Sequence, residues 1–279
     1  MTTVTVNVIV DLSVSFSTDA GSFSCCTTQA TRDNAAKIAR AADLVVYTTD
    51  VHDKTSAEFT TNGGLFPPHH ILGTCGGDAV PGSSPRPVPE VVEALKSRKA
   101  MVCVPRHVYF PTDDSLKKGV PVLTTADVEK EFGAPYAPED IAAAGAMLKT
   151  RGGEVSLLYS AKNCFNGVIE MPVCNCTAAG HVDGVPDKCY NAFTLLRSVY
   201  GLGKGLRFVV DGVVLSICVY QVASNIKQVF PEATVLLVSD ACTALPGEPV
   251  PGSNWDAVVK AMSGQIGVET TTMEEVLKM

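Results

Sequence analysis

Short apolar runs alternate with segments of helical periodicity along this chain, and this pattern constrains the fold more than any other feature. The apolar runs predict strands at residues 4–10, 44–48, 100–104, 154–159, 206–210 and 234–238. The periodic segments predict helices at residues 31–44, 89–97, 138–150, 188–200, 218–230 and 255–262. Because several of these strands are short, continuously apolar and separated by helices, we expect an α/β fold with a mostly parallel sheet covered on both faces.

A single domain is expected over residues 1–279. This length is near the upper limit for one hydrophobic core, and no change of composition marks a second core. Residues 105–153 hold extra material with one or two helices, which we interpret as an insertion that covers the site or an oligomer interface. Thr271 and Glu274 have the spacing of a capping box, which predicts the start of the last helical turn.

Composition and charge limit the class of protein. No apolar run reaches the roughly 18 residues of a membrane helix, so no membrane span is expected. The N-terminal segment MTTVTVNVIVDLSVSF lacks a basic region and alternates like a strand, which indicates a cytoplasmic protein with free thiols among its ten cysteines. A net charge of −7 without a basic stripe argues against a nucleic-acid partner and favours a small-molecule substrate. No sequence feature sets the number of subunits, and a homo-oligomer remains open.

Polar residues follow several of the predicted strands. Asp11 follows the first strand, Asp50 and His52 follow the second, and Lys162 follows the strand at residues 154–159. Cys218 comes shortly after the strand at 206–210 and opens the next helix. In a parallel sheet the carboxyl ends of the strands share one edge, where ligands bind. We therefore expect these side chains to lie close together.

Asp50, His52 and His69 are candidate metal ligands. Residues i and i+2 beyond a strand end can both turn toward one ion, and the loop that follows can return a second imidazole. One carboxylate and two imidazoles suit Zn, Fe(II) or Mn, and three protein ligands leave positions for water and substrate. The alternative is that these are ordinary polar residues in surface loops.

Cys218 is a candidate nucleophile. A cysteine at a helix N-terminus lies beside unpaired N–H groups, which lower the pKa of the thiol. Asp11 can take the thiol proton, and the Lys162 ammonium can keep that carboxylate oriented and charged. The alternatives are a buried packing cysteine and a strand-end ion pair.

Two further groups of cysteines carry less weight. The residues Cys174, Cys176, His181 and Cys189 could bind zinc, but the C-x-C pair lacks the usual ligand spacing, so a reduced loop without metal is expected. Cys25 and Cys26 are too close in sequence for a redox pair, and we interpret this pair as incidental.

The motifs as a set resemble the nicotinamidase and isochorismatase-like cysteine hydrolase superfamily. They are VIVDLSVSF at 8–16, TTDVH at 48–52, GGLFPPHHILGT at 63–74, YSAKNCFNGV at 159–168, DGVVLSICV at 211–219 and VLLVSDACTA at 235–244. These blocks cover most of the chain apart from the insertion, and FPPHHILGT and SDACTA are the most specific of them.

The resemblance implies a three-layer α-β-α fold and a metal-dependent cysteine amidohydrolase of the nicotinamidase branch. In this pattern Asp11 is the general base and acid, Lys162 the supporting cation and Cys218 the nucleophile. One divalent ion, Zn or else Fe or Mn, is held by a ligand set that includes His69, the residue directly after the Pro-Pro pair, and not His70. The full implied ligand set is Asp50, His52 and His69.

The resemblance also implies details of the substrate site. A cis peptide bond is expected between Val213 and Val214, and the N–H groups of Val214 and Cys218 are expected to form the oxyanion hole. The aromatic residues Phe16, Phe66 and Phe165 are expected to contact the substrate ring. The favoured reaction is hydrolysis of nicotinamide to nicotinate and ammonia through a Cys218 thioester, a step of NAD metabolism.

The chain departs from the superfamily pattern at several positions. Val51 and Phe66 stand where other aromatic residues are common, Ser13 replaces a Gln or Asn, and the residues flanking Cys218 are LSI and VYQVA. These changes leave two alternatives open. One is another small-amide or ureide hydrolase of the superfamily, and the other is a noncatalytic relative that binds a metabolite or a protein.

Overall fold

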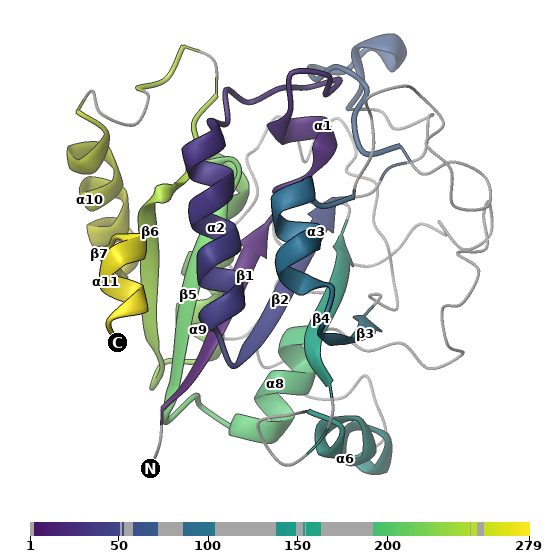
Figure 1. Ribbon diagram of the computed structural model, residues 1–279, viewed down its shortest axis with the longest axis vertical. Coiled ribbons are helices and arrows are strands. Elements are labelled where there is room, and N and C mark those ends of the chain that lie inside the picture. The colour runs from purple at the N-terminus through teal and green to yellow at the C-terminus, as the bar shows by residue number, and fades with distance from the viewer. Residues whose placement is uncertain are drawn as a thin grey trace.

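The protein is built on one seven-stranded sheet in which every strand pair is parallel. The computed structural model describes residues 3–50, 52, 58–71, 86–103, 138–148, 153, 155–162, 192–245, 247–249 and 254–279. The strand order is β3-β4-β2-β1-β5-β6-β7 (Figure 1). The strands are β1 (Val4–Val10), β2 (Leu44–Asp50), β3 (Lys99–Cys103), β4 (Val155–Lys162), β5 (Leu206–Gly212), β6 (Thr234–Cys242) and β7 (Glu269–Thr271).

Helices cover both faces of the sheet and make the three layers (Figure 1). One face packs against α2 (Gln29–Ala41), α3 (Pro89–Leu95) and α11 (Met273–Leu277). The other face packs against α8 (Ala192–Tyr200), α9 (Tyr220–Val229) and α10 (Trp255–Ile266). The remaining helical segments are α1 (Val14–Ser17), η1 (Thr60–Asn62), α6 (Pro138–Ala146), which contacts α8, and η3 (Leu215–Val219). The predicted α/β fold is thus confirmed.

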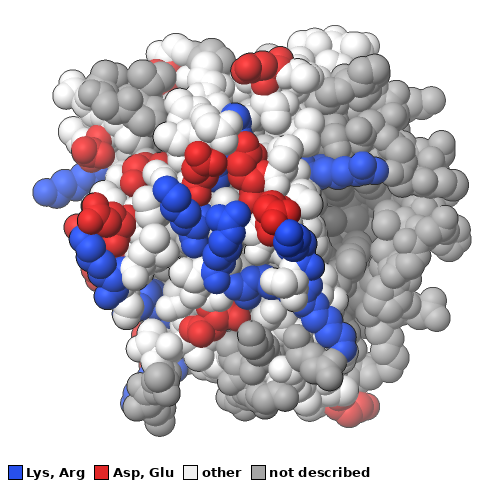
Figure 2. Space-filling view, in the orientation of Figure 1, with Lys and Arg blue, Asp and Glu red and all other residues white. Residues whose placement is uncertain are grey.

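The exposed surface of α2 and α3 carries charges of both signs. Figure 2 shows Lys and Arg intermixed with Asp and Glu on this face. Arg32 of α2 forms an ion pair with Glu90 of α3 at 3.3 Å, and Gln29 donates to the same carboxylate at 2.7 Å. These contacts connect the two helices. None of the described helices has the length and hydrophobicity needed to cross a membrane.

The predicted elements differ from the structure mainly at their ends. All six predicted strands are present, whereas β7 was missed because its three residues carry no apolar run. The capping box was placed one residue too early, since Thr272 and Glu275 form it while the Thr271 hydroxyl donates to the Glu275 carboxylate. Of the predicted insertion at 105–153, residues 105–137 and 149–152 lie outside the described residues, and its helix ends at Ala146.

The carboxyl ends of the central strands lie at one edge of the sheet, at the top of the view in Figure 1. Val10 pairs with Thr48 on one side and with Gly212 on the other, and Asp50 pairs with Lys162. This register places the residues that follow β1, β2, β4 and β5 side by side. The candidate site is built on this edge.

A buried polar pair lies within the sheet, on the side of α2. Asn7 of β1 donates to Asp211 Oδ2 of β5 at 2.6 Å and to the Val209 carbonyl at 3.1 Å. Within the described part of the chain, Asn7 Oδ1 and Asp211 Oδ1 have no hydrogen-bond partner. Burial raises the pKa of Asp211 well above its usual value, against the opposing effect of the Asn7 hydrogen bond. A protonated Asp211 could donate from Oδ1 to the amide oxygen Asn7 Oδ1, so we expect this carboxyl group to be neutral.

Asp211→Asn tests this expectation, because asparagine carries the donor at every pH. The folded-state pKa of Asp211 lies above its unfolded value of about 3.9, so protonation stabilises the fold at low pH, and this contribution is lost as pH rises through the folded pKa. We therefore expect D211N to gain stability relative to the parent as pH rises from 4 to 8, by about 1 kcal/mol or more. Denaturant unfolding across this pH range measures the difference.

The exposed residue Asp19 provides the control. D19N should leave the pH dependence of unfolding as it is in the parent. If the difference between D211N and the parent is the same at every pH, Asp211 does not titrate on unfolding in the way described.

Candidate active site

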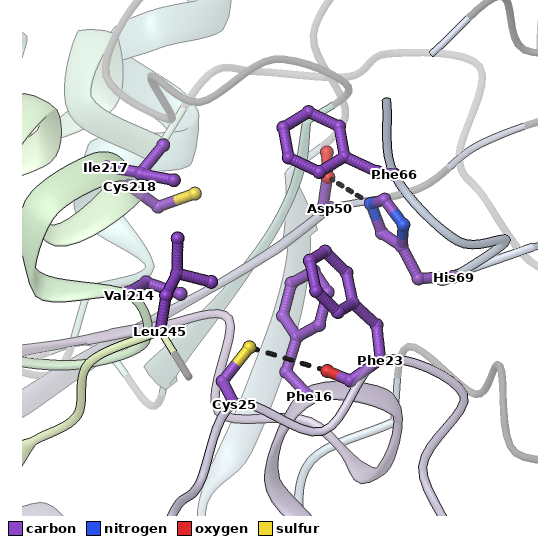
Figure 3. Close-up of a pocket in the computed structure, with 10 residues that line it drawn as sticks. All are labelled: Phe16, Phe23, Cys25, Asp50, Phe66, His69, Val214, Ile217, Cys218 and Leu245. Atoms are coloured by element: carbon purple, nitrogen blue, oxygen red, sulfur yellow. Dashed lines mark hydrogen bonds and ion pairs between the residues drawn. The ribbon is translucent and has the colours of Figure 1, made fainter. Parts of the chain in front are cut away.

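A pocket opens at the carboxyl edge of the sheet (Figure 3). It has a volume of about 380 Å³, which includes space open to solvent. The chain contributes to it from α1 and the segment after it, the end of β2, the loop that follows β2, the η3 turn and the segment after β6. The lining residues are Phe16, Phe23, Cys25, Asp50, Phe66, His69, Val214, Ile217, Cys218 and Leu245.

The pocket has one aliphatic and one aromatic side (Figure 3). Val214, Ile217 and Leu245 lie on the side of Cys218, and the phenyl rings lie on the side of His69. The ring of Phe16 lies 5.6 Å from that of Phe23 and 5.0 Å from that of His69. Such a space suits a flat apolar ring. Of the three aromatic residues expected to contact the substrate, Phe16 and Phe66 line this pocket, and Phe165 lies outside the described residues.

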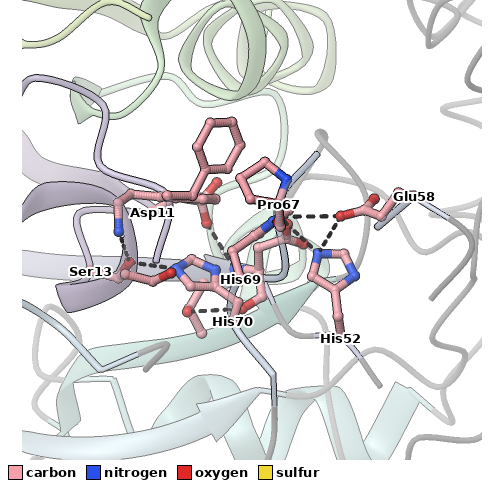
Figure 4. A network of polar contacts seen from close by, with 12 residues as sticks. Asp11, Ser13, His52, Glu58, Pro67, His69 and His70 are labelled. Carbon is pink, nitrogen blue, oxygen red and sulfur yellow. Dashed lines mark hydrogen bonds and ion pairs between the residues drawn. The ribbon is translucent and has the colours of Figure 1, made fainter. Parts of the chain in front are cut away.

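Four buried side chains form a cluster of metal-ligand type beside this pocket (Figure 4). His52 Nε2 lies 2.6 Å from Asp50 Oδ2 and 3.1 Å from Glu58 Oε1, and His69 Nε2 also lies 3.1 Å from Glu58 Oε1. All four ligand atoms lie within 4.8 Å of one another. Two ligands that share a zinc ion at about 2.1 Å lie about 3.0 to 3.4 Å apart, so the cluster is close to the spacing an ion needs.

The orientation of His69 also fits a metal ligand. Its Nδ1–H donates to the Pro67 carbonyl at 2.7 Å, which leaves Nε2 directed toward the two carboxylates. A metal-bound histidine commonly donates its other N–H in this way. Burial opposes the charged imidazole, but hydrogen bonds to Asp50 and Glu58 outweigh it and raise the pKa of His69 to about 9. The two buried carboxylates thus favour a positive charge at this place.

The predicted ligands Asp50, His52 and His69 are brought together, and the prediction missed Glu58. An acidic residue between the two ligand histidines would have been a further candidate ligand, but the sequence has two acidic residues in this interval, Asp53 and Glu58. Nothing in the sequence alone distinguishes them, because the path of a loop is not periodic. The donor set of two carboxylates and two imidazoles suits Zn, Fe(II) or Mn.

His70 lies outside the metal cluster, in agreement with the implied ligand set. Its Nε2 contacts the Ser13 hydroxyl, its ring lies 4.2 Å from that of Phe16, and its carbonyl accepts from the His52 N–H at 2.9 Å (Figure 4). Its φ is +46°, and its ring lies 5.8 Å from that of its neighbour His69. His70 therefore connects the segment after β1 to the metal cluster.

The sequence indicated that Cys218 opens an α-helix, but in the structure it lies in a π-helical turn. This turn, η3, begins at Leu215 and continues into α9 at Tyr220. The peptide bond between Val213 and Val214 is cis, which confirms the prediction. Within the described part of the chain, the Val214 N–H donates no hydrogen bond, whereas its carbonyl accepts from the N–H groups of Ile217 and Val219. The Val214 N–H is thus a donor that a ligand can use.

Asp11 is fully buried at the end of β1, where its φ is +50°. Its Oδ1 accepts from the Asp50 N–H at 2.8 Å, which joins it to the metal cluster. Lys162 ends β4 opposite Asp50, and its side chain lies outside the described part of the structure. The three predicted catalytic residues therefore belong to one edge of the sheet.

The pocket contains residues that sequence reasoning passed over. Cys25, interpreted as incidental, is fully buried in the pocket wall, and Phe23, Ile217 and Leu245 complete the lining. Burial, with nearby negative charge, raises the pKa of the Cys25 thiol to about 12. These residues lie in loops and in an irregular turn, where periodicity carries no signal. The cysteines at 174–189 lie outside the described residues.

The metal cluster makes a direct prediction for Glu58. Removing one charged ligand weakens binding, so we expect Glu58→Gln to lower the affinity of the metal-free protein for Zn²⁺ by about 10-fold or more, and His52→Ala to lower it further. Titration against a chromophoric chelator measures both. The exposed Glu93→Gln on α3 is the control, and equal affinities for E58Q and E93Q would remove Glu58 from the ligand set.

The sequence matches no protein-family model and no curated protein, but solved structures share its fold. PnC1 from L. infantum in complex with nicotinate has a TM-score of 0.52 at 16% identity, over 98% of this chain and 94% of that chain. The Acinetobacter baumanii nicotinamidase/pyrazinamidase has a TM-score of 0.51 at 14% identity, over 98% and 97%. The Streptococcus mutans pyrazinamidase/nicotinamidase has a TM-score of 0.51 at 15% identity, over 96% of this chain and 99% of that chain. The resemblance is thus confirmed at the level of the fold, and this chain has the three-layer α/β fold of the nicotinamidase and pyrazinamidase structures.

Proposed function

We propose that this protein is a metal-dependent cysteine amidohydrolase of the nicotinamidase branch of its superfamily, which hydrolyses nicotinamide to nicotinate and ammonia. One observation carries the proposal: the Cys218 residue and two members of the metal-type cluster, Asp50 and His69, line the same pocket. A nucleophile and an electrophilic centre that face one small cavity can hold two ends of one substrate.

In the proposed reaction, the Asp11 carboxylate takes the proton of the Cys218 thiol, and the thiolate attacks the amide carbonyl carbon. The N–H groups of Val214 and Cys218 hold the oxyanion, an interaction typically worth about 3 to 4 kcal/mol per donor. Asp11 then protonates the leaving nitrogen, the C–N bond breaks and ammonia leaves. Water, deprotonated by Asp11, attacks the thioester, and the sulfur regains its proton as nicotinate is released. Lys162 acts as the cation that keeps Asp11 charged between these steps.

The lining of the pocket supports an uncharged ring amide as substrate. A divalent ion in the cluster would supply a Lewis-acid site for the ring nitrogen of the substrate. The phenyl rings of Phe16 and Phe66 would contact the ring, with Phe165 as a further proposed contact. The described lining residues are mainly apolar and aromatic, which favours an uncharged ring.

The first test is turnover of nicotinamide, measured as ammonia release by the metal-loaded protein. We expect Cys218→Ala and Asp11→Asn to lower kcat by at least about 10³-fold, because each removes a group that takes part in bond making. Cys26→Ser, at an exposed position, is the control and should keep parental activity. A chelator should abolish turnover and Zn²⁺, Fe²⁺ or Mn²⁺ should restore it. Parental turnover by C218A would refute the mechanism.

The second test separates an enzyme from a noncatalytic relative by thiol reactivity. Iodoacetamide at pH 6.5 should label Cys218 before the exposed Cys26, because only a thiolate reacts quickly. The buried thiols Cys25 and Cys242 have raised pKa values and should react slowly. Asp11→Asn should slow labelling of Cys218 and leave Cys26 unchanged. Mass spectrometry locates the label, and preferential labelling of Cys26 in the parent would favour the noncatalytic alternative.

A further inference from the structure

The turn that carries Cys218 has few side chains that can hold it in place. Its five residues are LSICV, and apart from the nucleophile only Ser216 has a side chain that forms conventional hydrogen bonds. The residue before the turn is Val214, whose apolar side chain cannot cap it. Apart from the packing of Leu215 and Val219 in the core, the polar contacts that hold this turn therefore come from its backbone and from Ser216.

The segment after β6 supplies both kinds of contact. The Thr243 carbonyl accepts from the Leu215 N–H at 2.8 Å. The Glu248 carboxylate accepts from the Ser216 hydroxyl, with its two oxygens at 2.9 and 3.1 Å. Glu248 Oε2 also accepts from the Leu245 N–H at 3.1 Å, and the Glu248 N–H donates to the Leu245 carbonyl at 3.0 Å. One carboxylate thus joins the nucleophile turn to a residue of the pocket wall.

We propose that Glu248 is a positioning residue that acts through Ser216 to hold Cys218 and Leu245 in register around the substrate. This inference rests on the proposed function. The Glu248 side chain accepts from the Ser216 hydroxyl and from the Leu245 N–H, so one side chain can fix the turn relative to the pocket wall. A displacement of about 1 Å at a reacting group can cost about 100-fold in rate, which makes such a contact worth retaining.

The neighbouring Thr243 extends the same arrangement across the pocket. Its hydroxyl donates to the Cys25 carbonyl at 3.0 Å, and Cys25 lies in the pocket wall. The segment from Thr243 to Glu248 therefore contacts the segment after α1 as well as the nucleophile turn. Glu248 holds one end of this segment against Ser216, in the turn that contains Cys218.

Glu248 could instead act by its charge, and the choice of variant separates the two roles. Its negative charge is one of the smaller causes that raise the pKa of Cys25. In Glu248→Gln the amide oxygen can accept from Leu245 and Ser216 and the amide nitrogen can donate to the Ser216 hydroxyl, so the geometry is kept without the charge. In Glu248→Ala the hydrogen bonds and the charge are both lost.

The test measures kcat and KM for nicotinamide in metal-loaded variants, below the melting temperature of each. We expect E248A to lower kcat by about 10-fold or more with KM changed by less than about 3-fold, and E248Q to stay within about 3-fold of the parent. S216A should lower kcat as well, and the double variant S216A/E248A should be no slower than E248A, because S216A removes a contact that E248A has already lost. Glu269→Ala, an exposed change on β7, is the control.

Three outcomes would overturn the proposal. They are a kcat of E248Q as low as that of E248A, losses that multiply in the double variant, and a lower melting temperature of E248A without a change of kcat. The rate at which iodoacetamide labels Cys218 gives a second readout that needs no amide turnover. If the parent does not hydrolyse nicotinamide, the proposed function fails by itself, and the labelling rates of E248A, E248Q and the parent decide whether Glu248 positions the thiol.

Discussion

The hydrogen bond from the Asp50 N–H to Asp11 Oδ1, at 2.8 Å, joins the two halves of the site. Asp11 is the proposed acid and base, and Asp50 belongs to the metal-type cluster. The bond exists because β1 and β2 are adjacent and parallel, with Val10 beside Thr48. The same register places β5 and the turn after it on the other side of Asp11. A shift of these strands would move Cys218, Asp11 and the metal-type cluster apart from one another.

Burial of this much charge is costly, and the structure compensates it locally. Asp11, Asp50 and Glu58 are buried carboxylates at one edge of the sheet, and isolated charges in such places are strongly destabilising. The backbone N–H of Asp50 offsets part of the cost at Asp11, and His52 and His69 contact the other two. A cation in the cluster would offset the rest. The polar groups are therefore concentrated where the proposed chemistry needs them, and the remaining pocket wall is mainly apolar.

The sequence by itself determined the layers of this fold and the identity of many site residues. Apolar runs and helical periodicity report burial directly, so the central strands and the covering helices could be predicted to within a few residues. The positions after strands pointed to Asp11, Asp50, His52 and Cys218, because parallel strands end at a common edge. The superfamily motifs then distinguished His69 from His70 and indicated the cis peptide between Val213 and Val214, and the structure contains this cis peptide.

Only the tertiary structure decided which loop residues meet. Glu58 in the metal cluster, Cys25 in the pocket wall and Glu248 against Ser216 all lie in segments without periodicity. Glu58 contacts His52, only 6 residues earlier in the chain. Cys25 shares the pocket with Cys218, which is more than 190 residues away in the sequence. Sequence patterns report whether a residue is buried by its own helix or strand. They carry no information on the path of a loop, which depends on packing against the rest of the molecule.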